Sequence, residues 1–125
     1  MTPAENPSDF ENHFAAGIGV RCITPDEPIW LYGYANKQRF QPSVGVLDDL
    51  YARAVAFQDE DGVRAVIVTL DLCVPRKPLA QQMASAITTA TGIPRERIMI
   101  NASHTHSGPM LAQADVQDRF PVSDE

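Results

Sequence analysis

The sequence predicts an α/β (or α+β) domain built on a mixed β-sheet, with a hairpin and one β-α-β crossover. Residues 50–58 and 63–72 have strand patterns, and the turn signal Asp61-Gly62 between them predicts an antiparallel hairpin. Residues 63–72 are followed by a helical pattern and then by an apolar strand at 97–102. This order predicts two parallel strands joined by a right-handed crossover.

The elements before the hairpin are expected to be an arm, one strand and a loop. Residues 1–14 hold prolines, asparagines and carboxylates without periodicity, which predicts a mobile arm. Residues 15–23 are apolar around Gly17 and Gly19, which predicts a short strand that other backbone or a ligand approaches closely. Residues 35–45 are polar and contain proline and glycine, so they predict a long surface loop.

The remaining elements follow from periodicity and punctuation. Alternation over residues 50–58 predicts a strand with both faces at least partly covered, and the β-branched run 63–72 predicts a central strand buried on both faces. Pro78 marks a helix start and Gly92 its end. The predicted apolar face of this helix consists of Leu79, Met83, Ala86, Ile87 and Ala90.

Length and charge limit the classes of function. A chain of 125 residues supports one core, so we expect one incomplete domain at 15–110 and a polar tail at 111–125. The net charge of −6, with scattered Lys and Arg, argues against nucleic acid and anionic membranes as partners. There is no apolar run of transmembrane length and no signal-peptide pattern, which predicts a cytoplasmic location for the chain as it stands.

Two cysteines, Cys22 and Cys73, lie far apart without CxxC spacing. At most one disulfide could join them. We expect both to be small core residues in a reducing compartment.

The strongest chemical signal is the string Asn101-Ala-Ser-His-Thr-His-Ser-Gly-Pro109, directly after the last predicted strand. Two histidines two apart on extended chain point to the same side, so His104 and His106 can converge on one metal ion, or one can bind a metal while the other meets the substrate. Asp71 ends the neighbouring parallel strand, and ligands collect at such ends. Asp71 could bind the metal, orient an imidazole or act as a base. The alternative is a surface or packed histidine pair without a ligand.

Several ordered motifs together resemble the N-terminal part of the neutral/alkaline non-lysosomal ceramidases. They are the string 101–109, the helix end Ala90-Thr-Gly-Ile-Pro-Arg-Glu-Arg97, the segment Leu50-Tyr-Ala-Arg-Ala54 and Gly33-Tyr34-Ala35. The resemblance spans residues 17–109. It departs from the family at Leu47-Asp48, where the family often has His before Asp or Thr, and at Cys22, where it often has Asp.

The resemblance implies a zinc-dependent amidase that hydrolyses N-acylsphingosine to a fatty acid and sphingosine. It implies that His104 is a zinc ligand and that His106 contacts the scissile amide or its developing oxyanion. We expect Tyr34 to contact the lipid part of the substrate. Arg53 is expected to pair with Asp71 or Asp49, or to contact substrate.

The resemblance also implies that a second His, a Glu and a Tyr from farther downstream complete the zinc site. We therefore expect this chain to be a truncated or partial form, completed by a missing C-terminal portion or by homo-oligomerisation. Two other functions stay open. One is a non-catalytic remnant that keeps the fold as a binding module. The other is a different His-x-His metal-dependent hydrolase in which Asp71 completes the site.

Overall fold

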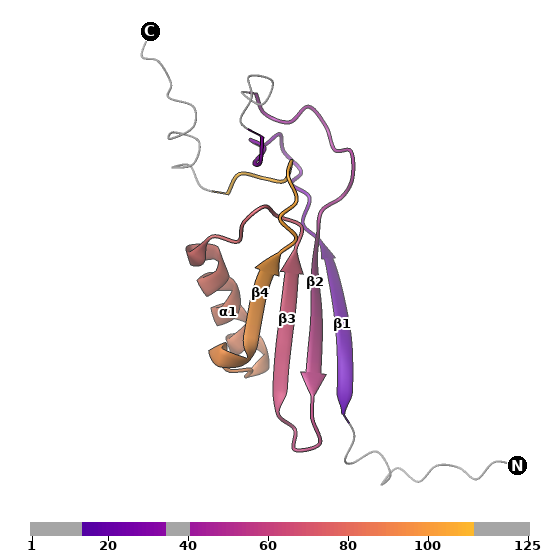
Figure 1. Cartoon of the computed structure of the whole chain (residues 1–125), viewed down its shortest axis with the longest axis vertical. Helices are drawn as coiled ribbons and strands as arrows, with labels where there is room; N and C mark the ends of the chain where they lie inside the picture. Colours follow the sequence, from indigo (N-terminus) through magenta and orange to yellow (C-terminus); the bar gives the residue numbers. More distant parts are fainter. Residues whose placement is uncertain (1–13, 35–40, 112–125) are drawn as a thin grey trace, which may run out of the picture.

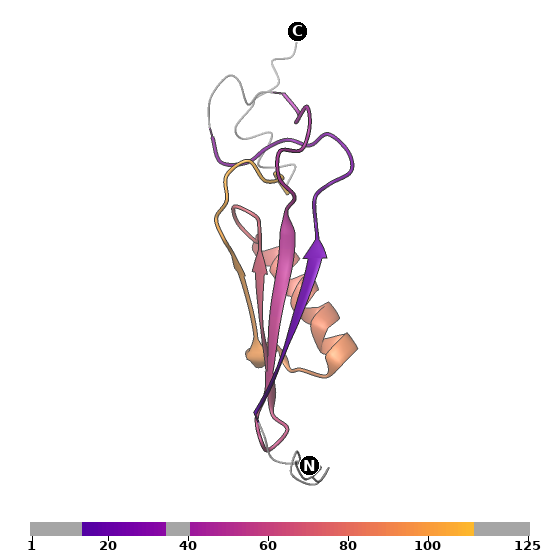
Figure 2. The same cartoon turned by 90° about the vertical axis from the view of Figure 1, so that its right-hand side faces the viewer.

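The computed structural model describes residues 14–34 and 41–111, which form a four-stranded mixed sheet with one helix against it (Figures 1 and 2). The spatial order of the strands is β1-β2-β3-β4. In chain order the elements are β1 (Ala15–Cys22), β2 (Tyr51–Gln58), β3 (Arg64–Leu70), α1 (Lys77–Thr91), a 3₁₀ turn (Arg95–Arg97) and β4 (Ile98–Ala102). The predicted arm, apart from Phe14, and the predicted tail, apart from Leu111, lie outside the described residues.

Strand pairing confirms the predicted fold class. β1 and β3 each pair with β2 in antiparallel register, whereas β3 pairs with β4 in parallel register across the α1 crossover. The β2–β3 hairpin is closed by Asp59, whose carboxylate accepts hydrogen bonds from the amides of Asp61 and Val63. Gly62 takes the positive φ of 76° that this turn requires.

Helix α1 begins and ends where proline and glycine predict. Pro78 lies in the first turn, and Gly92 adopts the left-handed conformation at the C-cap with its amide donating to the Thr88 carbonyl. The guanidinium of Arg64 donates to the Thr91 carbonyl at 2.8 Å and so satisfies another free carbonyl at this helix end.

The hydrophobic core lies between α1 and one face of the sheet. Figure 2 shows α1 on that side of the sheet. Its buried residues are Val66, Val68, Leu70, Leu72, Ala84, Ile93 and Ile98. The predicted helix face was partly wrong, because Ala84 is the buried alanine whereas Ala86 and Ala90 are exposed. On β3 every second residue, from Val66 to Leu70, is buried in this core, as the alternation of side chains along a strand requires.

The prediction that residues 63–72 are buried on both faces was wrong. Ile67, which points away from α1, is 38% exposed, and Met99 beside it on β4 is 58% exposed. Among the described residues, the single helix covers one face only, so β-branched composition did not imply two covered faces. All of β1 is exposed, and a side chain built at Gly17 or Gly19 would meet nothing within 4 Å, so the expected close approach is not found there.

The two cysteines differ in environment. Cys73 is buried, as expected, whereas Cys22 is exposed on the uncovered strand β1, and both are free thiols. Among the residues with assigned positions, no helix combines the length and apolar character needed to cross a bilayer.

Candidate functional site

The candidate site lies at the carboxyl ends of the parallel strands, at the upper end of the sheet in Figure 1. The ladders extend one residue beyond the strands, because the Asp71 amide donates to the Tyr51 carbonyl and the Ser103 amide donates to the Leu70 carbonyl. Asp71 and His104 therefore leave neighbouring strands at the same edge, as the sequence predicted.

The segment that carries both histidines is held by a second segment from before β2. The amide of Tyr32 donates to the Gly108 carbonyl and the Ser107 amide donates back to the Tyr32 carbonyl, both at 2.8 Å. Leu31 and Pro109 form an antiparallel bridge at the same place. This short pairing fixes the backbone around His106 although the two segments lie far apart in sequence.

The imidazoles of His104 and His106 converge, with ring centroids 5.2 Å apart. The predicted convergence is confirmed, but the predicted extended backbone was wrong. His104 has a φ of 59° and Ser107 a φ of 76°, so the chain turns at both positions. Left-handed backbone conformation at a histidine is uncommon, and here the surrounding hydrogen bonds hold it.

Gly33 and Tyr34 determine where the ring of His106 can lie. A Cβ placed at Gly33 would lie 2.5 Å from Cγ and 2.6 Å from Cβ of His106, and Gly33 has a φ of +116°. Only glycine fits this position without displacing the histidine. The Tyr34 ring meets the His106 ring edge-on, with centroids 4.8 Å apart, so the predicted substrate contact Tyr34 lies beside the site.

Cys73 joins the two histidines in a potential metal-binding group. The ligand atoms of Cys73, His104 and His106 all lie within 4.8 Å of one another. Imidazole nitrogens and a thiolate are the ligands that zinc prefers, so this donor set fits a zinc ion. The sequence analysis missed Cys73 as part of the site; its position two residues after Asp71, at the end of the strand beside β4, was the available signal.

The tautomer of His104 follows from its hydrogen bond. Its Nδ1 lies 2.8 Å from the carbonyl oxygen of Cys73. A carbonyl can only accept a hydrogen bond, so Nδ1 carries the proton and a neutral ring has its lone pair on Nε2. This is the outer-shell arrangement that commonly orients a metal-binding histidine.

The Asp71 carboxylate accepts hydrogen bonds from two residues of the neighbouring strand β2. Its Oδ2 accepts hydrogen bonds from the Arg53 guanidinium at 2.7 Å and from the Tyr51 amide at 3.0 Å, and Ser103 Oγ lies 3.5 Å from Oδ1. The Arg53 guanidinium, followed by the Tyr51 amide, lowers the pKa of the Asp71 carboxyl below its ordinary value of 3.8, although partial burial opposes the shift. The expected Arg53–Asp71 pair is confirmed, and the metal-binding group does not include Asp71.

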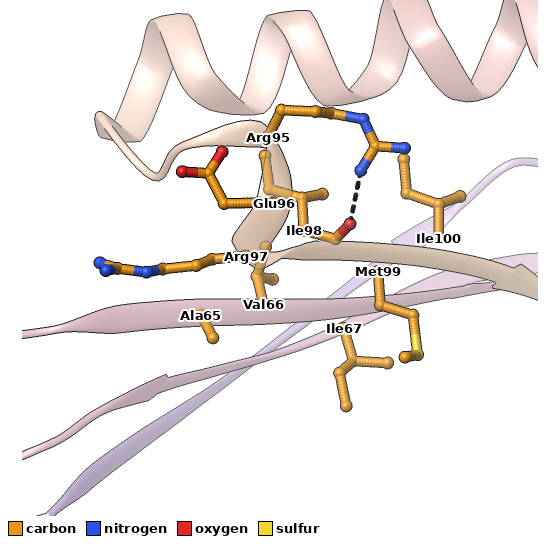
Figure 3. A pocket seen from close by; sticks show the side chains of 9 residues that line it. All are labelled: Ala65, Val66, Ile67, Arg95, Glu96, Arg97, Ile98, Met99 and Ile100. Carbon is orange, nitrogen blue, oxygen red and sulfur yellow. Dashed lines mark hydrogen bonds between the residues drawn. The ribbon is translucent and has the colours of Figure 1, made fainter.

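Pockets lie at two places on the described part of the chain that concern the site. One of about 550 Å³ adjoins the site, since Thr105, His106 and Ser107 form part of its wall. Its apolar lining residues are Pro25, Pro28, Ile29, Leu31, Val44, Val46, Leu47 and Leu50. The other, of about 490 Å³, lies along β3 and β4 and includes Arg95, Glu96 and Met99 (Figure 3). None of its lining residues belongs to the potential metal-binding group of Cys73, His104 and His106. The pocket beside His106 is therefore the one that adjoins the candidate site.

The chain is similar to known proteins in both sequence and structure. Residues 14–117 match the family described as neutral/alkaline non-lysosomal ceramidase, N-terminal. The chain is 29% identical to neutral ceramidase B of Dictyostelium discoideum over 106 residues, which cover 82% of this chain and 14% of that protein. It is also 29% identical to neutral ceramidase 2 of Arabidopsis thaliana over 99 residues, which cover 77% and 13%.

Solved structures give the same result. The neutral ceramidase of Pseudomonas aeruginosa matches with a TM-score of 0.69 and 26% identity, over 79% of this chain and 16% of that one. A ceramidase complexed with C2 matches with a TM-score of 0.68 over the same shares. The chain thus spans less than one fifth of the length of these relatives. With a match that covers most of its residues, the chain belongs to the neutral/alkaline ceramidase family and corresponds to part of its N-terminal region.

Proposed function

We propose that this chain forms part of the active site of a ceramidase-like, zinc-dependent amidohydrolase, which converts N-acylsphingosine and water to a fatty acid and sphingosine. The observation that carries the proposal is the convergence of His104, His106 and Cys73 at the carboxyl ends of two parallel strands. A pocket of about 550 Å³ next to His106, with more apolar than polar surface, supports a lipid amide as the substrate class.

In this proposal His104 is a zinc ligand through Nε2, and the Cys73 carbonyl holds its ring. A bound zinc ion supplies the Lewis acidity that an unactivated amide carbonyl requires. His106 donates a hydrogen bond to the carbonyl oxygen as negative charge develops on it. Such a donor typically stabilises a transition state by about 3–4 kcal/mol.

The surrounding residues position these groups and the substrate. Tyr34, packed edge-on against His106, limits the orientation of that ring and contacts the lipid. Arg53, half exposed at the site end of β2, contacts the polar part of the substrate, while its bond to Asp71 keeps that carboxylate ionised. Asp71 in turn keeps the end of β3 in place through the Tyr51 amide.

The residues that complete the site are proposed to come from further chain or from a second copy, because a catalytic zinc usually has three protein ligands and an open position. The coverage of 13–16% of the relatives' lengths supports this, and it also keeps the non-catalytic remnant as the second candidate. The third candidate, a hydrolase with Asp71 as metal ligand, is less favoured because Arg53 and Tyr51 already engage this carboxylate.

A hydrolysis assay with purified, zinc-loaded chain separates these functions. Where a second copy or further chain completes the site, we expect fatty acid release from N-acylsphingosine that is lost in His104→Ala and in His106→Ala but retained in Cys22→Ser, the exposed-thiol control. Zinc and lipid binding without hydrolysis would favour the remnant. Loss of zinc in Asp71→Ala would favour the third candidate, and a folded chain that binds neither zinc nor lipid would overturn the proposal.

A further inference from the structure

The outer edge of β1 (Ala15–Cys22) is a long, open strand edge. β1 is the first strand in the spatial order β1-β2-β3-β4, so among the described strands only β2 pairs with it. Its eight residues pair with β2 without a bulge, they include no proline, and Arg21 is the one charged residue among them. Edge strands of native proteins are usually short, bulged or charged, because an open edge pairs readily with another strand.

The backbone groups that β1 presents at this edge follow from the hydrogen bonds on its other side. The Ile23 amide donates to the Leu50 carbonyl, which continues the antiparallel β1–β2 ladder by one residue pair. Because hydrogen-bonded and non-hydrogen-bonded pairs alternate in such a ladder, the odd-numbered residues of β1 bond to β2. The amides and carbonyls of Ala16, Ile18 and Val20 therefore point to the open edge.

The opposite edge of the sheet is partly blocked. It is formed by β4, which has only five residues. The Ser103 amide donates to the Leu70 carbonyl, so the odd-numbered residues of this parallel ladder bond to β3 and the Ile98 carbonyl points outward. The Arg95 guanidinium donates to that carbonyl at 2.8 Å, as Figure 3 shows. Of the two edges, β1 is thus the one that is open to another strand.

The side chains along β1 are complementary to those of a second copy of this chain. One apolar row crosses all four strands on the face opposite α1 and consists of Ile18, Val55, Ile67 and Met99. Antiparallel pairing of two β1 strands about a two-fold axis at Ile18 places this residue opposite itself. The apolar row then continues into the second copy without a break. Like charges do not face each other, because Arg21 lies opposite Ala15 of the second copy.

We propose that two copies of this chain pair through the open edges of their β1 strands and form one continuous sheet. The sequence predicts that other backbone approaches Gly17 and Gly19, whereas within one chain a Cβ at either position meets nothing within 4 Å. In the proposed pairing, Gly17 lies opposite Gly19 of the second copy, whose backbone provides this approach. The two candidate sites lie at opposite ends of the joined sheet, so the inference does not rest on the proposed function.

Amide hydrogen exchange and sedimentation of the purified chain test this inference. The amides of Ala16, Ile18 and Val20 should exchange slowly at high protein concentration and fast on dilution, because the second copy provides their hydrogen-bond acceptors. The amides of Gly17 and Gly19, which bond to β2, should be equally protected at both concentrations. Sedimentation should give twice the mass of the chain at the high concentration.

Ile18→Lys should raise the dissociation constant of the dimer at least about tenfold, because an apolar pair at the two-fold axis is replaced by two like charges. Ile18 is 79% exposed in the single chain, so this change should leave the fold intact, which urea denaturation can verify. Met99→Lys is the matched control. It changes an exposed apolar residue on the same face, on the far strand β4, and should leave the dissociation constant unchanged.

A wild-type chain that stays monomeric, with fast exchange at Ala16, Ile18 and Val20 at every concentration, would overturn the inference. A dimer that Met99→Lys weakens as strongly as Ile18→Lys would also overturn it, because the copies would then pack through the open face of the sheet. If Ile18→Lys does not fold, the exchange pattern of the wild-type chain still decides between the dimer through β1 and its absence.

Discussion

Gly33→Ala should displace His106, because the added methyl group has no room. The new Cβ would lie 2.5 Å from His106 Cγ, whereas carbon atoms in contact prefer about 3.5–4.0 Å. The histidine must therefore move by about 1 Å. The φ of +116° at Gly33 adds strain of about 1–3 kcal/mol for a residue with a Cβ, and overpacking adds about 1–3 kcal/mol. We expect the free energy of unfolding to fall by about 2–6 kcal/mol.

Urea denaturation measures this loss, and NMR signals of the His106 ring report its displacement. Where the site is complete, hydrolysis of N-acylsphingosine by the same variant should be slower, since the proposed oxyanion donor has moved. Gly19→Ala is the matched control, because a Cβ there meets nothing within 4 Å. The control should change the free energy of unfolding by less than about 1 kcal/mol. A Gly33→Ala variant with the wild-type urea midpoint and unchanged His106 signals would refute this reasoning.

Three further predictions concern stability. The Asp71 carboxyl has a lowered folded-state pKa, so the stability that it contributes is present above the unfolded value of about 4 and is lost as pH falls through the folded value. Asp71→Asn should therefore lower the free energy of unfolding by about 1 kcal/mol at neutral pH. The free energy measured by urea denaturation should also fall less between neutral and acid pH than in the wild-type chain, and an unchanged pH dependence would contradict this. Gly92→Ala should lower stability by about 1 kcal/mol in thermal melts, because the C-cap φ of 72° disfavours a side chain, whereas an equal melting temperature would argue against it. Zinc at 100 times its Kd should stabilise the wild-type chain by about 2.7 kcal/mol but not His104→Ala, and EDTA should reverse the effect; equal stabilisation of both chains would point to another site.

The parts of the fold with local signals were predictable from sequence. The Asp61-Gly62 turn, the Pro78 and Gly92 helix ends and the parallel crossover all follow from residues close together in the chain. Burial of the second sheet face was not predictable, because composition shows that Ile67 is apolar but not whether an element covers it.

The site was predictable to the extent that strand ends determine it. His104 and Asp71 were expected at one edge and lie there. The approach of Gly33 to His106 depends on pairing between segments more than 70 residues apart, for which the sequence carries no local signal. Cys73 was missed because a cysteine at the end of an apolar strand is most often a core residue, and only its contact with His104 indicates another role.

The proposed role of His104 as a zinc ligand is best tested by the zinc stoichiometry and affinity of the purified chain, with His104→Ala as control. We expect about one specific zinc ion per chain, or per oligomer if a second copy completes the site, with binding lost on mutation. A folded chain that binds no zinc, or that binds it equally well without His104, would contradict the proposed zinc site.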